Sequence, residues 1–458
     1  MIEYSILGGW GIWNNLLSVE AKYYLTKGKT TKRWVYEMET IKPGSKVEIE
    51  TTDKKFTGIL MERPQLADDK HIVIKLGSGY NIGIKKEKIK NMKEIKEGRK
   101  KEEFKLKEHK IDPEKPTISI LATGGTIASR LDYLTGGVHS AFTAEELISA
   151  VPELEEIANI RGRQIFNKFS ENIQPRDWIK IAEETAKEIR KGIDGVVITH
   201  GTDTMHYTSA ALAFMLKTPV PVVLTGAQRS SDRGSSDAAM NLINSAFTAA
   251  NGNFSEICIV MHGEMSDSYS LIHPATRVRK LHSSRRDAFQ TVNSKPIGKV
   301  ENKKIEYTER ETKPRGGELK LDTKLEEKVF LLKYHPGLIP GIIEKLIDIE
   351  YRGIVIEGTG LGHTSEILFD SIKEAIDSGI TIAMTSQTLY GRVNMNVYST
   401  GRMLLDLGVI PCEDMLPETA FVKLMFVLGH TKDPEKVEEM MLTNYAGEIT
   451  ERSIPWPP

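Results

Sequence analysis

Residues 118–128 read ISILATGGTIA, an apolar run that passes directly into Thr123, a glycine pair and Thr126. A continuous apolar run of this length is typical of a strand that is buried on both faces. The pair Gly124 and Gly125 lets the backbone turn sharply and approach a ligand closely. A plain strand–turn is the alternative, and a nucleotide P-loop is disfavoured because no GK[ST] follows. The stretch predicts a strand that presents hydroxyl groups at its carboxyl end.

Further apolar runs follow this stretch along the chain, at 195–200 (GVVITH), 221–226 (PVVLTG) and 256–263 (EICIVMHG). Helical segments such as WIKIAEETAKEIRKG and SDAAMNLINSAFTAA separate them. Alternating strands and helices predict an α/β fold with a parallel sheet and ligands at the carboxyl ends of the strands. We assign a large α/β domain to residues 117–334. A polar stretch near 310–335 and new runs at 353–358 and 380–386 predict a smaller α/β domain over 335–458.

The amino-terminal part has a different texture. Residues 41–96 contain short alternating runs divided by Gly, Pro, Asp and Asn, which predict a small all-β module of about five strands, SH3-like or barrel-like. Residues 97–116 are expected to be a charged linker. Residues 85–110 hold 12 Lys/Arg against six acidic residues, and a solvated linker is favoured over a nucleic-acid contact because aromatic residues are nearly absent. Residues 1–40 form an extension whose status is open, since Met38 is an alternative start.

Composition excludes several classes of protein. The 458 residues carry a net charge of −1, which favours no polyanionic partner for the chain as a whole. The two cysteines, Cys258 and Cys412, support neither a zinc site nor a disulfide framework. No run approaches the ~18 apolar residues of a membrane span, and the amino terminus lacks signal-peptide features. A reduced, cytoplasmic location is the expectation.

A second hydroxyl-rich motif, Thr199-His200-Gly201-Thr202-Asp203-Thr204-Met205, follows the run at 195–198. By itself the Thr-Asp pair is explained as a helix N-cap. Strand ends of one α/β sheet meet at a common crevice, so two such motifs indicate a joint site.

These motifs resemble the L-asparaginase/glutaminase family over roughly residues 117–445. The segments that carry the resemblance occur in the family's order: TGGTIAS, FSENIQPRDW around Ser170, HGTDT, LTGAQR, RVRKLHSSRRDAFQT around Lys280, GTGLGH and GVIPCEDMLPETAFVKLM. The resemblance implies an amidohydrolase that releases ammonia from a side-chain amide.

The resemblance also implies roles for individual residues. Thr126 would be the nucleophile of an acyl-enzyme, and Thr202, Asp203 and Lys280 the second catalytic group, in which Lys280 orients Thr202 and acts as a base. The sequence leaves open which threonine attacks first. Tyr133, in the loop after Thr126, would belong to a lid that closes over the substrate.

Substrate binding needs partners for an ammonium and a carboxylate. Asp203 suits the ammonium, with Glu171 as a second candidate. Ser170 and the backbone N–H groups near Gly125 and Gly201 suit the carboxylate and the oxyanion.

The segment 391–401 departs from bacterial periplasmic members, which place a glutamate of the neighbouring subunit near the substrate amine. Here the segment offers Asn394, Asn396 and Tyr398, so this part of substrate binding must differ. No HEXXH or other ligand spacing occurs among the histidines, so no metal is implied.

With the β-module added, the architecture resembles the D-subunit family of archaeal glutamyl-tRNA(Gln) amidotransferases. This resemblance implies glutamine as substrate, no cofactor in this chain, and a partner E subunit that uses ATP and Mg to amidate the misacylated tRNA. It also implies a homodimer core within a heterotetramer, with the tRNA bound mainly by the partner. A stand-alone L-asparaginase is the alternative. A non-catalytic binding protein is disfavoured because Thr126, Thr202, Asp203 and Lys280 are all present.

Overall fold

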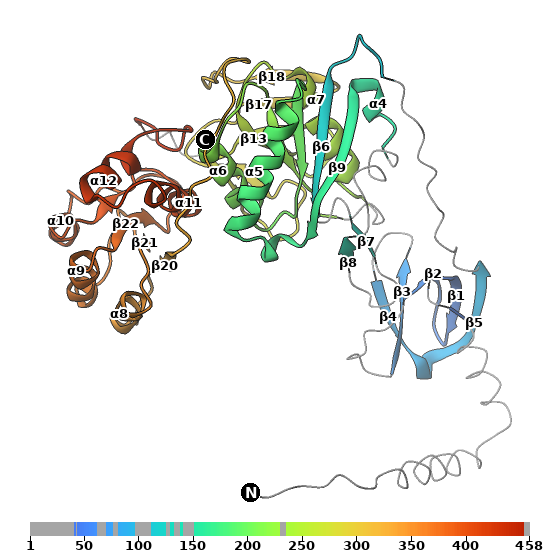
Figure 1. Cartoon of the computed structure of the whole chain (residues 1–458). Coiled ribbons are helices and arrows are strands. Elements are labelled where there is room, and N and C mark those ends of the chain that lie inside the picture. Colours follow the sequence, from blue (N-terminus) through green and yellow to red (C-terminus); the bar gives the residue numbers. More distant parts are fainter. Residues whose placement is uncertain are drawn as a thin grey trace, which may run out of the picture. The chain divides into compact units, whose positions relative to one another are not determined.

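The computed structural model describes residues 41–42, 44–61, 70–76, 81–96, 111–124, 129–131, 138–140, 151–229 and 235–452 (Figure 1). The chain forms two compact units. One comprises residues 1–103 with 132–137, and the other comprises residues 104–131 with 138–458.

The first unit contains the predicted all-β module. Its five strands are β1 (Lys46–Thr51), β2 (Lys55–Leu60), β3 (His71–Leu76), β4 (Asn81–Lys85) and β5 (Ile89–Lys96). They form an antiparallel sheet in the order β4-β3-β2-β1-β5. Alternate residues such as Val47, Ile49 and Ile74 are buried in its core, as a strand with one covered face requires. The expected all-β module is confirmed.

The second unit is built on a sheet of eight strands in the order β18-β17-β14-β13-β12-β10-β6-β9. The neighbours β9, β6, β10, β12 and β13 run parallel, while β14, β17 and β18 are added antiparallel. The strands are β6 (Thr117–Gly124), β9 (Asn159–Lys168), β10 (Gly195–Thr199), β12 (Val222–Thr225), β13 (Ile257–His262), β14 (Ser270–Pro274), β17 (Gly298–Glu301) and β18 (Lys304–Tyr307). The expected α/β fold is confirmed, but the sheet is mixed rather than wholly parallel.

Helices on both faces explain the continuous apolar runs of this sheet. Val196 and Ile198 of β10 pack in one core with α5 (Pro175–Ile189) and α6 (Met205–Met215). Val197, between them, packs in another core with α7 (Ala238–Asn251). Both faces of β10 are therefore buried, and the carboxyl ends of the strands remain as the place for polar chemistry.

A smaller parallel sheet follows, with β20 (Val329–Lys333), β21 (Gly353–Gly358), β22 (Thr381–Ser386) and β23 (Ile410–Pro411) in that order. Its helices are α8 (Gly341–Asp348), α9 (Phe369–Asp377), α10 (Ser399–Asp406), α11 (Pro417–Leu428) and α12 (Pro434–Leu442). The boundary expected at residue 335 stays a prediction, and β20, just before it, pairs with β21.

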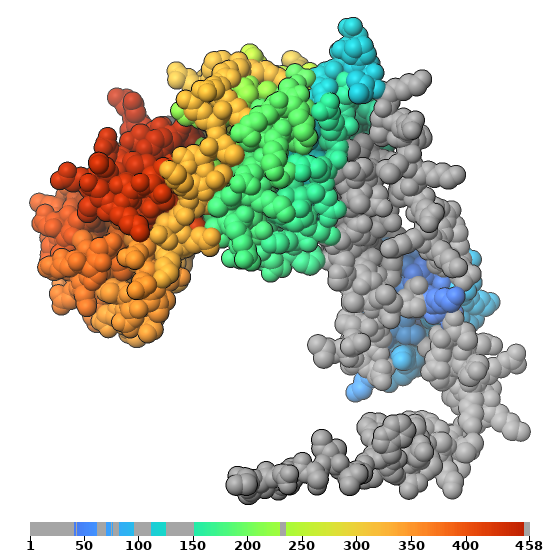
Figure 2. Space-filling view, viewed as in Figure 1, coloured from blue at the N-terminus to red at the C-terminus, as the bar shows by residue number. Residues whose placement is uncertain are grey.

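Residues 308–328, here called the strap, connect the two sheets along the surface. Within it, β19 (Lys320–Leu321) pairs with β11 (Leu216–Lys217), which follows α6 directly. In Figure 2 this orange-yellow strap runs over the surface beside green residues of the larger sheet region and red residues of the carboxyl-terminal helices. No helix in the described part of the chain has the length and apolarity to cross a membrane.

Candidate functional site

The two hydroxyl-rich motifs lie at the carboxyl ends of neighbouring strands. Strands β6 and β10 pair in parallel, and the Thr123 hydroxyl donates a hydrogen bond of 2.8 Å to the Thr199 carbonyl. This bond ties the start of the first motif to the start of the second. Gly125, Thr126 and the expected lid residue Tyr133 lie outside the described residues.

Lys280 is brought to the second motif from a distant part of the chain. It ends β15 (Val278–Lys280), and its partner in the antiparallel strand β16 (Phe289–Thr291) is Phe289. The Lys280 ammonium donates to Thr202 Oγ1 at 2.9 Å and to Asp203 Oδ1 at 2.7 Å. The Lys280 side chain is only 10% exposed, whereas that of Asp203 is 66% exposed. One end of this triad is therefore buried and the other is open to a ligand.

Ser170 lies against the backbone of the same motif. It is buried at the start of the short 3-10 helix Ser170–Asn172, and its carbonyl accepts a 2.7 Å hydrogen bond from the Thr204 hydroxyl. A Cβ on Gly201 would lie 2.8 Å from Ser170 Cβ and 2.9 Å from its Oγ, so only glycine allows this approach. The structure therefore brings Ser170, Gly201, Thr202, Asp203 and Lys280 together. The side chain of Glu171 is exposed beside them in the chain.

The turn after β12 packs closely against Thr202 at Gly226. A Cβ on Gly226 would lie 3.0 Å from Thr202 Cγ2 and 2.6 Å from the His200 carbonyl. The buried Asp237 carboxylate accepts from the backbone N–H groups of Gln228 and Arg229 at 3.0 and 2.9 Å.

Asn241 completes this support by donating to the Gly226 carbonyl at 3.0 Å. Neither Asp237 nor Asn241 was singled out from the sequence. Asp237 is the N-cap of α7, where an acid is explained equally well as a helix-start residue, and Asn241 follows in the first turns of the helix.

The histidines near the site are held in their neutral form. Burial lowers the pKa of His200 to about 4, and its ring nitrogens face the Gly201 carbonyl and the Thr208 hydroxyl. Burial also lowers the pKa values of His206 and His273, each to about 3. Within the described ranges, no group of three or more His, Cys, Asp or Glu residues is arranged to hold a metal ion.

The strand that carries Lys280 is also attached to the smaller domain. Arg279 forms an ion pair of 2.9 Å with Glu418 at the start of α11, and burial raises the pKa of Glu418. Arg277 pairs with Asp414 at 3.1 Å, and both side chains are fully buried. Alternation along a strand sends residues 277 and 279 to one side and Lys280 to the other. This alternation in RVRK could have indicated that Arg277 and Arg279 share one side, but not which residues they pair with.

The segment 391–401 lies in the smaller domain. Asn394, Asn396 and Tyr398 are exposed, and Tyr398 packs edge-on against His363 with ring centroids 5.4 Å apart. The Asn394 N–H donates to the Leu361 carbonyl at 3.0 Å. The segment therefore presents polar side chains to solvent rather than a carboxylate.

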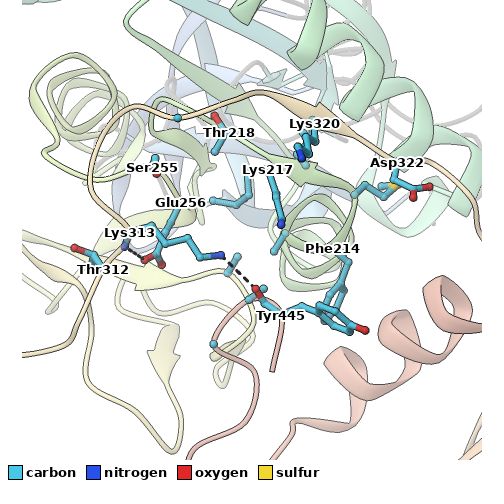
Figure 3. Close-up of a pocket in the computed structure, with 18 of the residues that line it drawn as sticks. Phe214, Lys217, Thr218, Ser255, Glu256, Thr312, Lys313, Lys320, Asp322 and Tyr445 are labelled. Carbon is cyan, nitrogen blue, oxygen red and sulfur yellow. Dashed lines mark hydrogen bonds between the residues drawn. The ribbon is translucent and has the colours of Figure 1, made fainter. Parts of the chain in front are cut away.

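A separate cavity of about 1390 Å³ lies under the strap (Figure 3). Phe214, Lys217, Glu256, Lys313 and Tyr445 line it, among others, and the Lys313 ammonium donates to the Tyr445 carbonyl at 3.2 Å. None of the residues brought together around Lys280 lines this cavity. Its lining carries cations and anions side by side, so it favours neither sign of ligand.

Comparisons with known proteins show which families this chain matches. The family described as asparaginase, N-terminal, matches residues 117–313, and the glutaminase/asparaginase C-terminal domain matches residues 328–441. A family described as GatD N-terminal domain matches residues 41–95.

Whole-chain relatives cover nearly the full length. The glutamyl-tRNA(Gln) amidotransferase D subunit of Pyrococcus furiosus is 56% identical over 420 residues, which are 91% of this chain and 94% of the relative. The protein of the same name from Methanothermobacter thermautotrophicus is 52% identical, over 91% of this chain and 96% of its own. Among solved structures, the thermostable L-asparaginase of Thermococcus kodakarensis has a TM-score of 0.66 and 35% identity, covering 73% of this chain and all of its own.

Proposed function

The chain belongs to the family of glutamyl-tRNA(Gln) amidotransferase D subunits and is an enzyme with an asparaginase-type amidohydrolase region, and we propose that it releases ammonia from glutamine for the amidation of Glu-tRNA(Gln). The observation that carries the proposal is the contact of the Lys280 ammonium with both Thr202 and Asp203 at the strand ends. The module at residues 41–95, which matches the family's amino-terminal domain, supports the assignment to the amidotransferase rather than to a free-standing asparaginase.

In the proposed mechanism the hydroxyl of Thr126 attacks the amide carbon of glutamine. The C–N bond breaks, the hydroxyl proton is delivered to the leaving nitrogen, and ammonia departs from an ester-linked acyl-enzyme. Water then cleaves the ester to give glutamate and the free hydroxyl. Lys280 orients Thr202 and relays the proton, and the lid carrying Tyr133 excludes bulk water.

Substrate binding uses the open end of the triad. Asp203 is exposed enough to meet the ammonium of free glutamine while its second oxygen stays available, since Oδ1 accepts from Lys280. Ser170 and the backbone near Gly125 and Gly201 bind the carboxylate and the oxyanion, and Glu171 is a second partner for the ammonium.

The proposed assembly is cytoplasmic. A homodimer of this chain forms the core of a heterotetramer with an E subunit, which binds ATP, Mg and most of the tRNA. This chain itself uses no cofactor. Ammonia travels to the partner through a protected passage, because ammonium in bulk water is a poor nucleophile.

The decisive experiment measures ammonia release from glutamine and from asparagine by the purified chain. The assay is repeated with the E subunit, ATP, Mg and Glu-tRNA(Gln). Glutamine hydrolysis that is slow alone and rises sharply in the full mixture supports the proposal. Fast asparagine hydrolysis that ignores the additions would instead identify a stand-alone L-asparaginase. Thr126→Ala and Thr202→Ala, compared by mass spectrometry for a trapped acyl-enzyme, decide which threonine attacks.

A further inference from the structure

The catalytic chemistry leaves the β-module without a role, and its charge differs from that of the rest of the chain. The whole chain is nearly neutral, with 62 Lys/Arg against 63 Asp/Glu. Residues 41–96 alone hold 13 Lys/Arg against eight acidic residues. The near-neutral total therefore conceals a positively charged module, and a local positive field attracts polyanions regardless of the net charge elsewhere.

The fold gathers part of this charge at one end of the module. The turn between β1 and β2 bonds to the turn between β4 and β5, because the Thr52 N–H donates to the Lys88 carbonyl at 3.1 Å. Two segments that are separate in sequence thus place four exposed lysines at this end, here called the lysine cluster: Lys54, Lys85, Lys86 and Lys88.

Little opposite charge neutralises the lysine cluster within its described segments. The acidic residues there are Asp53 and Glu87. The ion pair between Lys85 and Glu87 has a long N–O distance of 3.8 Å, and its side chains are 55% and 74% exposed. A pair of this kind is solvated and weak, so a ligand with strong acceptors can displace it.

The surroundings of the lysine cluster decide the kind of partner. Protein interfaces need a desolvated apolar centre, and the exposed large apolar side chain of the described module is Ile95. Ile89 pairs with Thr51 and marks the end of β5 that lies beside the lysine cluster. Ile95 follows Glu94, the partner of Val47, and so lies at the opposite end of β5. No exposed aromatic side chain is available for base stacking among the described residues of the module. Lysines that have no exposed apolar or aromatic neighbours among the described residues suit a row of phosphates and carry no sequence readout.

We propose that the lysine cluster binds the phosphate backbone of structured RNA, so that the β-module holds the tRNA on which the complex acts. The choice of a phosphate backbone rests on the charge and its surroundings. The choice of tRNA rests on the proposed function. The module thereby adds a tRNA contact on this chain to the contacts made by the partner subunit.

The test is binding of fluorescently labelled tRNA to the full-length chain, followed by anisotropy between 50 and 200 mM salt. Lys54→Glu/Lys86→Glu/Lys88→Glu should weaken binding at least tenfold. It should also reduce the slope of log K against log salt by about 2–3, since each phosphate contact contributes about 0.7–0.9. The control reverses three exposed lysines of the smaller domain, Lys345→Glu/Lys373→Glu/Lys436→Glu, and should bind as the unaltered chain does.

Ammonia release from glutamine in the absence of RNA should be the same for both triple variants, which shows that each folds. Unchanged affinity and salt slope in the cluster variant would overturn the proposal. So would loss of E-subunit binding with tRNA binding intact, which would make the cluster a site for an acidic protein surface. Failure of the glutaminase assay would refute the proposed function and leave the RNA-binding result to stand separately.

Discussion

At the residue scale, Lys280 holds two acceptors of the second motif with one ammonium group. Its hydrogen bonds to Thr202 and Asp203 measure 2.9 and 2.7 Å. Lys280→Met keeps most of the side-chain volume but removes both bonds and, with them, the proposed proton relay. We expect ammonia release to fall by about 10²–10⁴-fold, the usual contribution of a positioned acid–base group. The measurement is steady-state ammonia release, with a melting curve to confirm folding.

A surface lysine provides the matched control for this variant. Lys295 is 58% exposed and pairs with the exposed Glu309, so Lys295→Met should leave turnover unchanged. If Lys280→Met retained more than a tenth of the activity, the role of Lys280 in proton transfer would be wrong.

We expect His273 to make the free energy of unfolding sensitive to acid. Burial lowers its pKa from 6.5 to about 3. Between these two pH values His273 is therefore protonated in the unfolded chain and neutral in the folded chain. This part of the stability is fully present above pH 6.5 and is lost as the pH falls. Between pH 7.5 and 5.5 it should decrease by about 1.4 kcal/mol.

His273→Gln removes the titration while an amide can still bond to the Thr291 hydroxyl, which His273 Nδ1 contacts at 2.8 Å. Urea titrations at the two pH values should show a smaller pH dependence for this variant, whereas the exposed His335→Gln should follow the unaltered chain. An equal pH dependence in all three proteins would show that His273 is not the group responsible.

At the scale of elements, the short helix at Ser170 and the loop after β10 can pack closely only because residue 201 is a glycine and has no side chain. A Cβ on Gly201 would come within 2.8 Å of Ser170 Cβ and 3.0 Å of its backbone nitrogen. Gly201→Ala should push the two segments apart, cost about 1–3 kcal/mol of stability, and raise KM for glutamine at least tenfold. Gly341→Ala is the control, because its Cβ meets nothing closer than 4.0 Å. Normal KM in Gly201→Ala would mean that this contact does not shape the substrate site.

The elements that could be predicted from the sequence are those that follow local rules. The run at 195–199 is buried on both faces, so its strand and the polar strand end were predictable, and so was the meeting of Thr202, Asp203 and Lys280 through the family motifs. The antiparallel addition of β17 and β18 was not, because short half-exposed strands show no continuous apolar run. Arg277 and Asp414 are 137 positions apart, and no local pattern pairs residues at such a distance. The position of Thr126 lies outside the described residues.

At the scale of the whole molecule, β15 and the preceding Arg277 contact both domains of the second unit. Lys280 points to the strand ends of the larger sheet, while Arg277 and Arg279 contact Asp414 and Glu418 of the smaller domain. We therefore expect the position of Lys280 to depend on how the smaller domain is packed. We also expect the site in the larger domain to depend on the carboxyl-terminal part of the chain.

Arg277→Met tests this dependence directly. Arg277 also donates to the carbonyls of Asp414 and Gly447, each at 2.9 Å, so the substitution leaves a buried carboxylate and two carbonyls short of a donor. We expect a loss of about 3–5 kcal/mol in the free energy of unfolding, as for other buried pairs that lose one partner. Turnover should also fall, because residue 277 immediately precedes β15. Arg277→Met/Asp414→Leu should recover part of the stability, because no unpaired carboxylate is left buried. It should not recover the turnover, because the ion pair that attaches residue 277 to the smaller domain is still missing. Full activity in Arg277→Met, measured below its melting temperature, would show that Lys280 is positioned by the larger domain alone.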